Sequence, residues 1–108
     1  MSLSPRLLDR LRDMAERHRE VGLLLAEPEA LKDGERFRAL SREYAELGEV
    51  VTALAAYDDL AAQLADSRAL AEGSDVEMAE MAREELGLLA AAQAEAEAAL
   101  ERLLVPKD

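Results

Sequence analysis

The sequence has 108 residues but no cysteine and no tryptophan, and it contains only one phenylalanine and two tyrosines. Without cysteine the chain forms no disulfide and offers no thiolate as a nucleophile or metal ligand, which is typical of cytoplasmic proteins. Half of the residues are hydrophobic, but few are aromatic. The interior must therefore consist of thin layers of leucine and alanine, with little room for a large ligand cavity.

Other features of enzymes and membrane proteins are also missing. No hydrophobic run approaches the ~20 residues of a membrane span, and no signal peptide pattern is present. The five glycines are isolated, so no phosphate-binding loop is formed. His18 is the only histidine, which leaves only carboxylates as metal ligands and no nucleophile–base set. We expect no catalytic residue, cofactor, metal or small-molecule substrate, and a protein that is not an enzyme.

The net charge of −11 is distributed unevenly along the chain. Residues 1–50 carry 9 Lys or Arg and 11 Asp or Glu, whereas residues 51–108 carry 4 and 13. The second half should therefore repel phosphate backbones. Any contact with nucleic acid must use the arginines of the first half.

Hydrophobic residues at alternating three- and four-residue spacings predict three helices, near residues 5–26, 34–72 and 75–104. The central stretch Glu35–Val51 organises the chain, because it combines the only phenylalanine with the longest helix. Its apolar stripe continues into the next turn and consists of Phe37, Leu40, Tyr44, Leu47, Val51 and Leu54. We expect the helix to pass through Gly48, since the periodicity stays in phase on both sides.

Local signals mark the helix ends. Ser4 before a proline predicts the first N-cap, and Pro28 ends that helix and opens a loop. Asp33 is the expected cap of the second helix. Gly73 is expected to end the second helix in the left-handed conformation, and Ser74–Glu77 reads as a capping box for the third.

The expected fold class is therefore all-α, with a single helical domain over residues 1–108. The short turn after the second helix predicts a long antiparallel, coiled-coil-like hairpin of the second and third helices. The first helix should pack on the Phe37–Leu54 half to complete a three-helix bundle. Residues 105–108 are expected to lead out of the domain. Residues 1–3 are interpreted as an expression remnant, and no expectation about the fold rests on them.

Polar residues interrupt the apolar stripes at His18, Asp58 and Gln93. We interpret His18 as a half-buried residue at the edge of the bundle. The other two are interpreted as residues that set helix register or mark where a neighbouring helix leaves. Partner contact is the candidate role of five arginines, with intrahelical ion pairs such as Arg42 with Glu46 as the alternative. The five candidates are Arg17, Arg19, Arg36, Arg38 and Arg42.

Three segments resemble one known family: LRDMAERHREV (11–21), ERFRALSREYAELGEVV (35–51) and LLVPKD (103–108). They are similar to the N-terminal domain of the bacterial class I peptide chain release factors that read UAA and UAG. The resemblance implies a cytoplasmic helical bundle that serves ribosome or partner binding in translation termination. It also implies that the full-length factor is a substrate of a glutamine methyltransferase. The family's Gly-Gly-Gln and Pro-x-Thr motifs are absent here, so we expect a fragment without either activity.

Two other functions remain open at this point. A stand-alone coiled-coil adaptor fits the composition and the heptads equally well. An all-α enzyme similar to chorismate mutase also has three helices, one of them long. That enzyme needs inward-facing Lys or Arg side chains for its dianionic substrate, however, and the stripes of this chain place its cations outward.

Overall fold

The computed structural model describes residues 3–106, which form three α-helices and one short 3₁₀-helix. These are α1 (Pro5–Ala26), η1 (Pro28–Lys32), α2 (Gly34–Ala71) and α3 (Val76–Leu103). The described part of the chain contains no β-strand. The all-α fold is therefore confirmed, and the expected helix boundaries are correct to within one residue.

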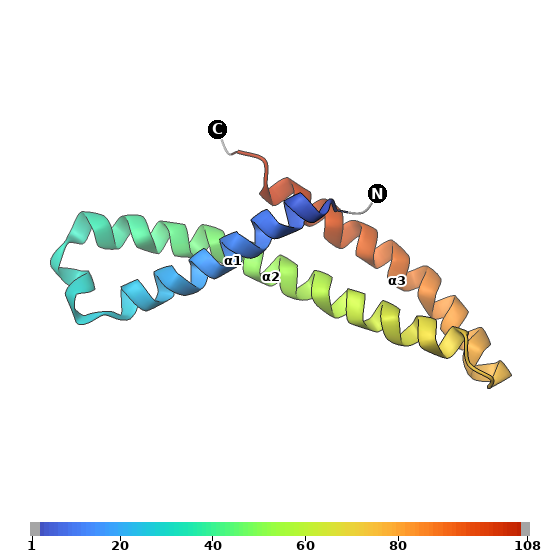
Figure 1. Ribbon diagram of the computed structural model, residues 1–108. Coiled ribbons are helices and arrows are strands. Elements are labelled where there is room, and N and C mark those ends of the chain that lie inside the picture. The colour runs from blue at the N-terminus through green and yellow to red at the C-terminus, as the bar shows by residue number, and fades with distance from the viewer. Residues whose placement is uncertain (1–2, 107–108) are drawn as a thin grey trace.

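The three helices are arranged around α2 in an elongated molecule of 64 × 31 × 19 Å (Figure 1). α1 packs against the first half of α2, and α3 runs back along the second half. The turn between α2 and α3 spans only residues 72–75, so an antiparallel hairpin is the arrangement it permits. The start of α1 and the end of α3 consequently meet near the middle of α2.

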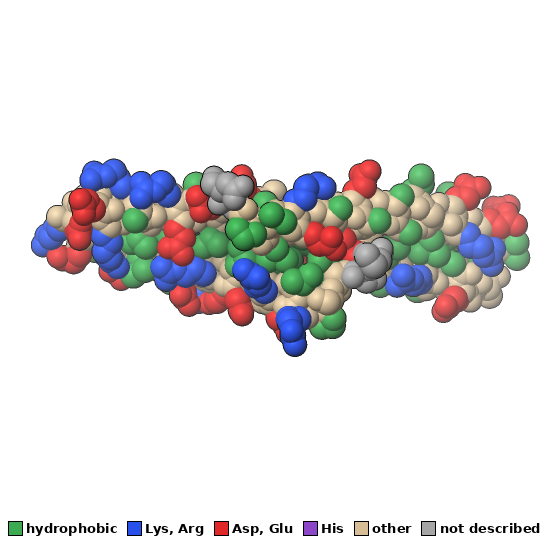
Figure 2. Space-filling view, turned by 90° about the horizontal axis from the view of Figure 1, so that it is seen from above, with side chains coloured by type: hydrophobic (Ala, Val, Ile, Leu, Met, Phe, Trp, Pro, Cys, Tyr) green, Lys and Arg blue, Asp and Glu red, His purple; other side chains and the backbone are tan. Residues whose placement is uncertain are grey.

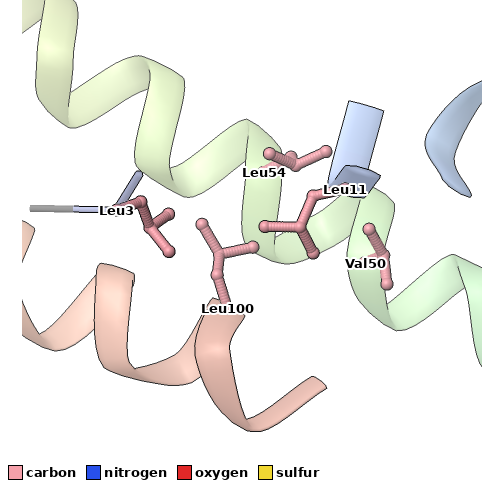
Figure 3. Packing of buried hydrophobic residues seen from close by; sticks show 5 residues of the cluster. All are labelled: Leu3, Leu11, Val50, Leu54 and Leu100. Carbon is pink, nitrogen blue, oxygen red and sulfur yellow. The ribbon is translucent and has the colours of Figure 1, made fainter. Parts of the chain in front are cut away.

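The main hydrophobic core lies where these three helices come together (Figure 3). Leu11 from α1, Val50 from α2 and Leu100 from α3 are at most 1% exposed. Leu54 and Leu3 complete this buried cluster. Leu3, on which no expectation about the fold rested, is therefore part of the core, whereas residues 1–2 lie outside the described residues.

Two expectations about the α2–α3 turn are wrong. Asp75, not Ser74, caps α3, because its carboxylate accepts a hydrogen bond from the backbone N–H of Met78 at 3.1 Å. No glycine among the described residues has a positive φ, so Gly73 is not left-handed. Its N–H instead donates to the carbonyl of Leu70, and this tight right-handed turn satisfies the end of α2.

The other helix ends follow the sequence signals more closely. The hydroxyl of Ser4 accepts from the N–H of Leu7, and α1 stops before Pro28 as expected. The segment after α1 is not a simple loop, because it contains η1 and buries Ala30. Asp33 then caps α2 by accepting from the N–H of Arg36.

Two rings and two glycines lie close together where α1 and α2 cross. The rings of His18 and Tyr44 are stacked, with centroids 4.1 Å apart. A Cβ on Gly22 would lie 3.0 Å from the Tyr44 ring, and a Cβ on Gly48 would lie 3.6 Å from the His18 ring. Gly22 thus makes room for the Tyr44 ring, whereas a Cβ at position 48 would make only ordinary van der Waals contact with His18. α2 continues through Gly48 as expected, and His18 is half-buried, as its position in the stripe predicted.

Candidate functional site

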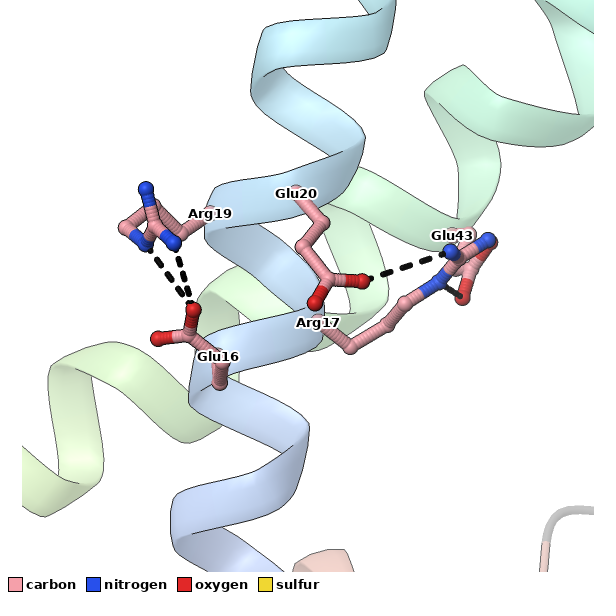
Figure 4. A network of polar contacts seen from close by, with 5 residues as sticks. All are labelled: Glu16, Arg17, Arg19, Glu20 and Glu43. Carbon is pink, nitrogen blue, oxygen red and sulfur yellow. Dashed lines mark hydrogen bonds and ion pairs between the residues drawn. The ribbon is translucent and has the colours of Figure 1, made fainter.

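Two of the five candidate arginines, Arg17 and Arg19, form ion pairs with glutamates of this chain (Figure 4). The guanidinium of Arg17 donates two hydrogen bonds to the carboxylate of Glu43, at 2.8 and 3.0 Å, and so links α1 to α2. Glu20 lies 3.8 Å from the same guanidinium. Arg19 donates to Glu16 on its own helix, at 2.6 and 3.1 Å.

These contacts change the titration of the carboxylates. The hydrogen bonds from Arg17 lower the pKa of Glu43, and burial opposes that shift. The hydrogen bonds from Arg19 lower the pKa of Glu16 in the same way. Both glutamates are therefore charged at neutral pH and hold their arginines in place. A partner would have to replace these contacts before it could bind either arginine.

A second bidentate pair links α1 to α2 beside the main core. The Nη1 and Nη2 atoms of Arg12 each donate to an oxygen of Asp58 at 2.8 Å. The hydrogen bond lowers the pKa of Asp58 below its ordinary value of 3.8. Asp58 therefore interrupts the stripe of α2 because it faces an arginine of α1 at the edge of the crossing.

This pair gives a pH-dependent prediction. At pH 7, Asp58→Asn should lower the free energy of unfolding by less than about 1 kcal/mol, since both side chains are about half exposed. Because the folded-state pKa is depressed, the contribution is present above the unfolded pKa of about 4 and is lost as the pH falls through the folded value. Urea melts of the unaltered chain and of Asp58→Asn should give different free energies of unfolding at pH about 7 but equal ones at pH about 2. An undiminished difference at the lower pH would contradict this assignment.

The other three candidates lie in the first turns of α2, near the end where α1 meets α2. Arg36, Arg38 and Arg42 are exposed. Within residues 3–106 their guanidinium groups form no ion pair, and the expected pair of Arg42 with Glu46 is not formed. Arg38 and Arg42 are four residues apart and share one face of α2. Figure 2 shows Lys and Arg side chains gathered at this end of the molecule, interspersed with acidic ones.

The inner face of the α2–α3 hairpin contains two polar side chains. Glu97 is buried, and its carboxylate accepts a hydrogen bond from the N–H of Leu3 at 2.6 Å. Gln93, one turn earlier, has a buried Oε1 atom without a hydrogen-bond partner in the described part of the chain. Both line a hollow that also borders Tyr57 and Arg68. The sequence did not single out Glu97. Its partner Leu3 could have been found, because Leu3 lies four residues before Leu7 and so continues the apolar stripe of α1.

None of these groups forms a constellation typical of catalysis. Among residues 3–106, no cluster of His, Asp or Glu is arranged to hold a metal ion. The buried polar side chains of the described core are Ser67 and Glu97, so no cation is buried there to hold a dianionic substrate. The surfaces described above are suited to binding another macromolecule through exposed charges.

Comparison with known protein families identifies the chain. The family model of the PCRF domain matches residues 14–108, which is most of the sequence. The chain belongs to the PCRF domain family. No solved structure matches it.

The PCRF domain is a domain of peptide chain release factors, the proteins of translation termination. These factors are not classical enzymes, and their domain implies interaction with the ribosome in general. Membership therefore favours neither the stand-alone adaptor nor the chorismate-mutase-like enzyme. Within the described residues, no helix is long and apolar enough to cross a membrane.

Proposed function

We propose that this PCRF domain is the N-terminal domain of a bacterial, cytoplasmic class I release factor that reads UAA and UAG. We further propose that it contacts ribosomal RNA through Arg36, Arg38 and Arg42. The observation that carries the second proposal is that these exposed guanidinium groups have no ion-pair partner in the described chain. They can meet phosphates without first breaking an ion pair within the described chain.

Electrostatics favour the same surface. Residues 51–108 carry a net charge of −9, so α3 and the second half of α2 approach a phosphate backbone only at an electrostatic cost. Residues 1–50 carry −2, and the unpaired arginines lie within this half. Arg17 and Arg19 belong to the same proposed surface. They would contact RNA only after their ion pairs with glutamates break.

The domain supports termination by binding and not by chemistry. The sequence contains neither the Gly-Gly-Gln motif nor the Pro-x-Thr tripeptide of class I factors. Peptide release and codon reading would then belong to other domains of the factor. The glutamine methyltransferase implied by the resemblance would likewise act on the full-length factor.

The test is charge reversal of the two arginines that share a face. Arg38→Glu/Arg42→Glu should weaken binding of the 108-residue chain to ribosomes by about tenfold or more at low salt, because phosphate neutralisation dominates such binding. The difference from the unaltered chain should shrink as salt screens the charges. Binding can be followed by fluorescence anisotropy of the labelled chain at two salt concentrations.

The matched control places the same charge change in the acidic hairpin. Arg83→Glu/Arg102→Glu also reverses two arginines, and both residues are exposed on α3. This control should change binding less than about threefold, through net charge alone. Equal losses in the two variants, or no loss in the first, would remove these arginines as the contact surface.

A further inference from the structure

The outward face of α3 is a second surface with a definite chemical character, at the opposite end of the molecule from the unpaired arginines. The inner face of α3 packs against α2 through one heptad-like stripe, which includes the buried residues Ala79, Ala82 and Leu89. A second stripe at the same spacing runs along the outside. It consists of Glu77, Met81, Glu84, Leu88, Ala91 and Glu95, all exposed.

Two large hydrophobic side chains in this outer stripe are unusually exposed. Met81 is 67% exposed and Leu88 is 71% exposed, and they lie seven residues apart on the same face. No packing role within residues 3–106 accounts for them, since α2 contacts the other side of α3. Figure 2 shows hydrophobic and acidic side chains, with some Lys or Arg side chains beside them, at the end where α2 turns into α3.

The carboxylates around Met81 form the other half of this surface. Glu77, Glu80 and Glu84 line a hollow of about 300 Å³ together with Met81. The nearby basic residue Arg83 is directed away from them, because its guanidinium donates to the carbonyl of Ala71 on α2, at 3.4 Å. The hollow therefore combines an apolar floor with three carboxylates and no cation.

We propose that the outer stripe of α3 is a docking surface for a basic amphipathic helix of a partner protein. A lysine or arginine of that helix would lay its methylene stem on Met81 and place its charged end among the three glutamates. An apolar residue one or two turns further along would cover Leu88. Charge complementarity selects this occupant: RNA is repelled, and a second copy of the chain would bring like charges together.

This proposal is independent of the arginine surface, because it concerns another face and a different class of partner. The probe is a synthetic helix of about 20 residues, with leucines on one face and arginines beside them. A scrambled peptide of identical composition separates an amphipathic match from simple charge attraction. Affinity for the 108-residue chain is measured by fluorescence anisotropy at about 50 and about 300 mM salt.

Substitutions distinguish binding at the outer stripe of α3 from general attraction to the acidic hairpin. Glu80→Lys/Glu84→Lys and, separately, Met81→Ser should each weaken peptide binding by about fivefold or more. The matched control Asp66→Lys/Glu101→Lys makes the same charge change at exposed positions on other faces and should change binding less than twofold or so. Circular dichroism confirms that each variant remains helical.

Three results would overturn the proposal. The first is equal binding of the designed and scrambled peptides, and the second is an equal loss in the glutamate variant and its control. The third is undiminished binding by Met81→Ser, which would show that the exposed side chain is not part of the contact. Selective binding of the amphipathic peptide that is lost in both face variants would establish the surface.

Discussion

Leu100→Ala is expected to lower the free energy of unfolding by about 3–5 kcal/mol, the upper range for a buried leucine. Leu100 is 0% exposed and lies where α1, α2 and α3 meet (Figure 3). Its removal leaves a cavity bordered by side chains from all three helices, including Leu11 and Leu54. If one helix moved to fill this cavity, it would lose packing contacts with its other neighbours, because the helices are already closely packed.

The measurement is a urea melt of each variant at pH 7, and the matched control is Leu88→Ala. Leu88 lies on the same helix but is 71% exposed, so its truncation should change stability by less than about 0.5 kcal/mol. Leu89→Ala, one residue further, should lie closer to the Leu100 variant because Leu89 is buried against α2. Similar losses for Leu88 and Leu100 would mean that the packing of α3 is assigned to the wrong face.

Glu97→Ala is expected to destabilise the domain by about 1–3 kcal/mol. The carboxylate of Glu97 is buried and accepts the backbone N–H of Leu3, so truncation leaves that buried donor without a partner. Leu3 also belongs to the main core, and we expect this hydrogen bond to help hold it there. The substitution should therefore loosen the segment before α1 as well as the end of α3.

Glu95→Ala is the control for this prediction. Glu95 lies two residues earlier on the outward face of α3 and should change stability by less than about 0.5 kcal/mol. Amide hydrogen exchange adds a local readout, because exchange of the Leu3 N–H should accelerate in the Glu97 variant alone. Unchanged protection of that amide would mean that the hydrogen bond contributes nothing to the position of Leu3.

The candidate site was only partly readable from the sequence. Five arginines stood out by composition and position, but their spacing could not distinguish paired from unpaired ones. Arg42 has a glutamate four residues away and forms no ion pair with it, whereas Arg17 pairs with Glu43 from another helix. The cross-helix partner depends on how α1 crosses α2, which spacing within one helix does not encode.

The helix ends also contain features that the sequence predicts and features that it does not. Ser4 and Asp33 cap their helices as predicted, because a capping side chain bonds a backbone N–H only two or three residues away. The α2–α3 turn was misassigned because Ser74 and Asp75 are adjacent and both are good caps. The structure places Asp75 at the N-cap of α3.

The sequence by itself determined that this chain forms three helices, where they begin and end, and which face of each is apolar. Those properties follow from periodicity and capping, which act within one or two turns. Only the tertiary structure decided that Leu3 is part of the core, that Glu97 is buried, and that Gly22 lies tightly against the ring of Tyr44. Each of these depends on side chains distant in sequence, which meet only when the helices cross at one angle and one register.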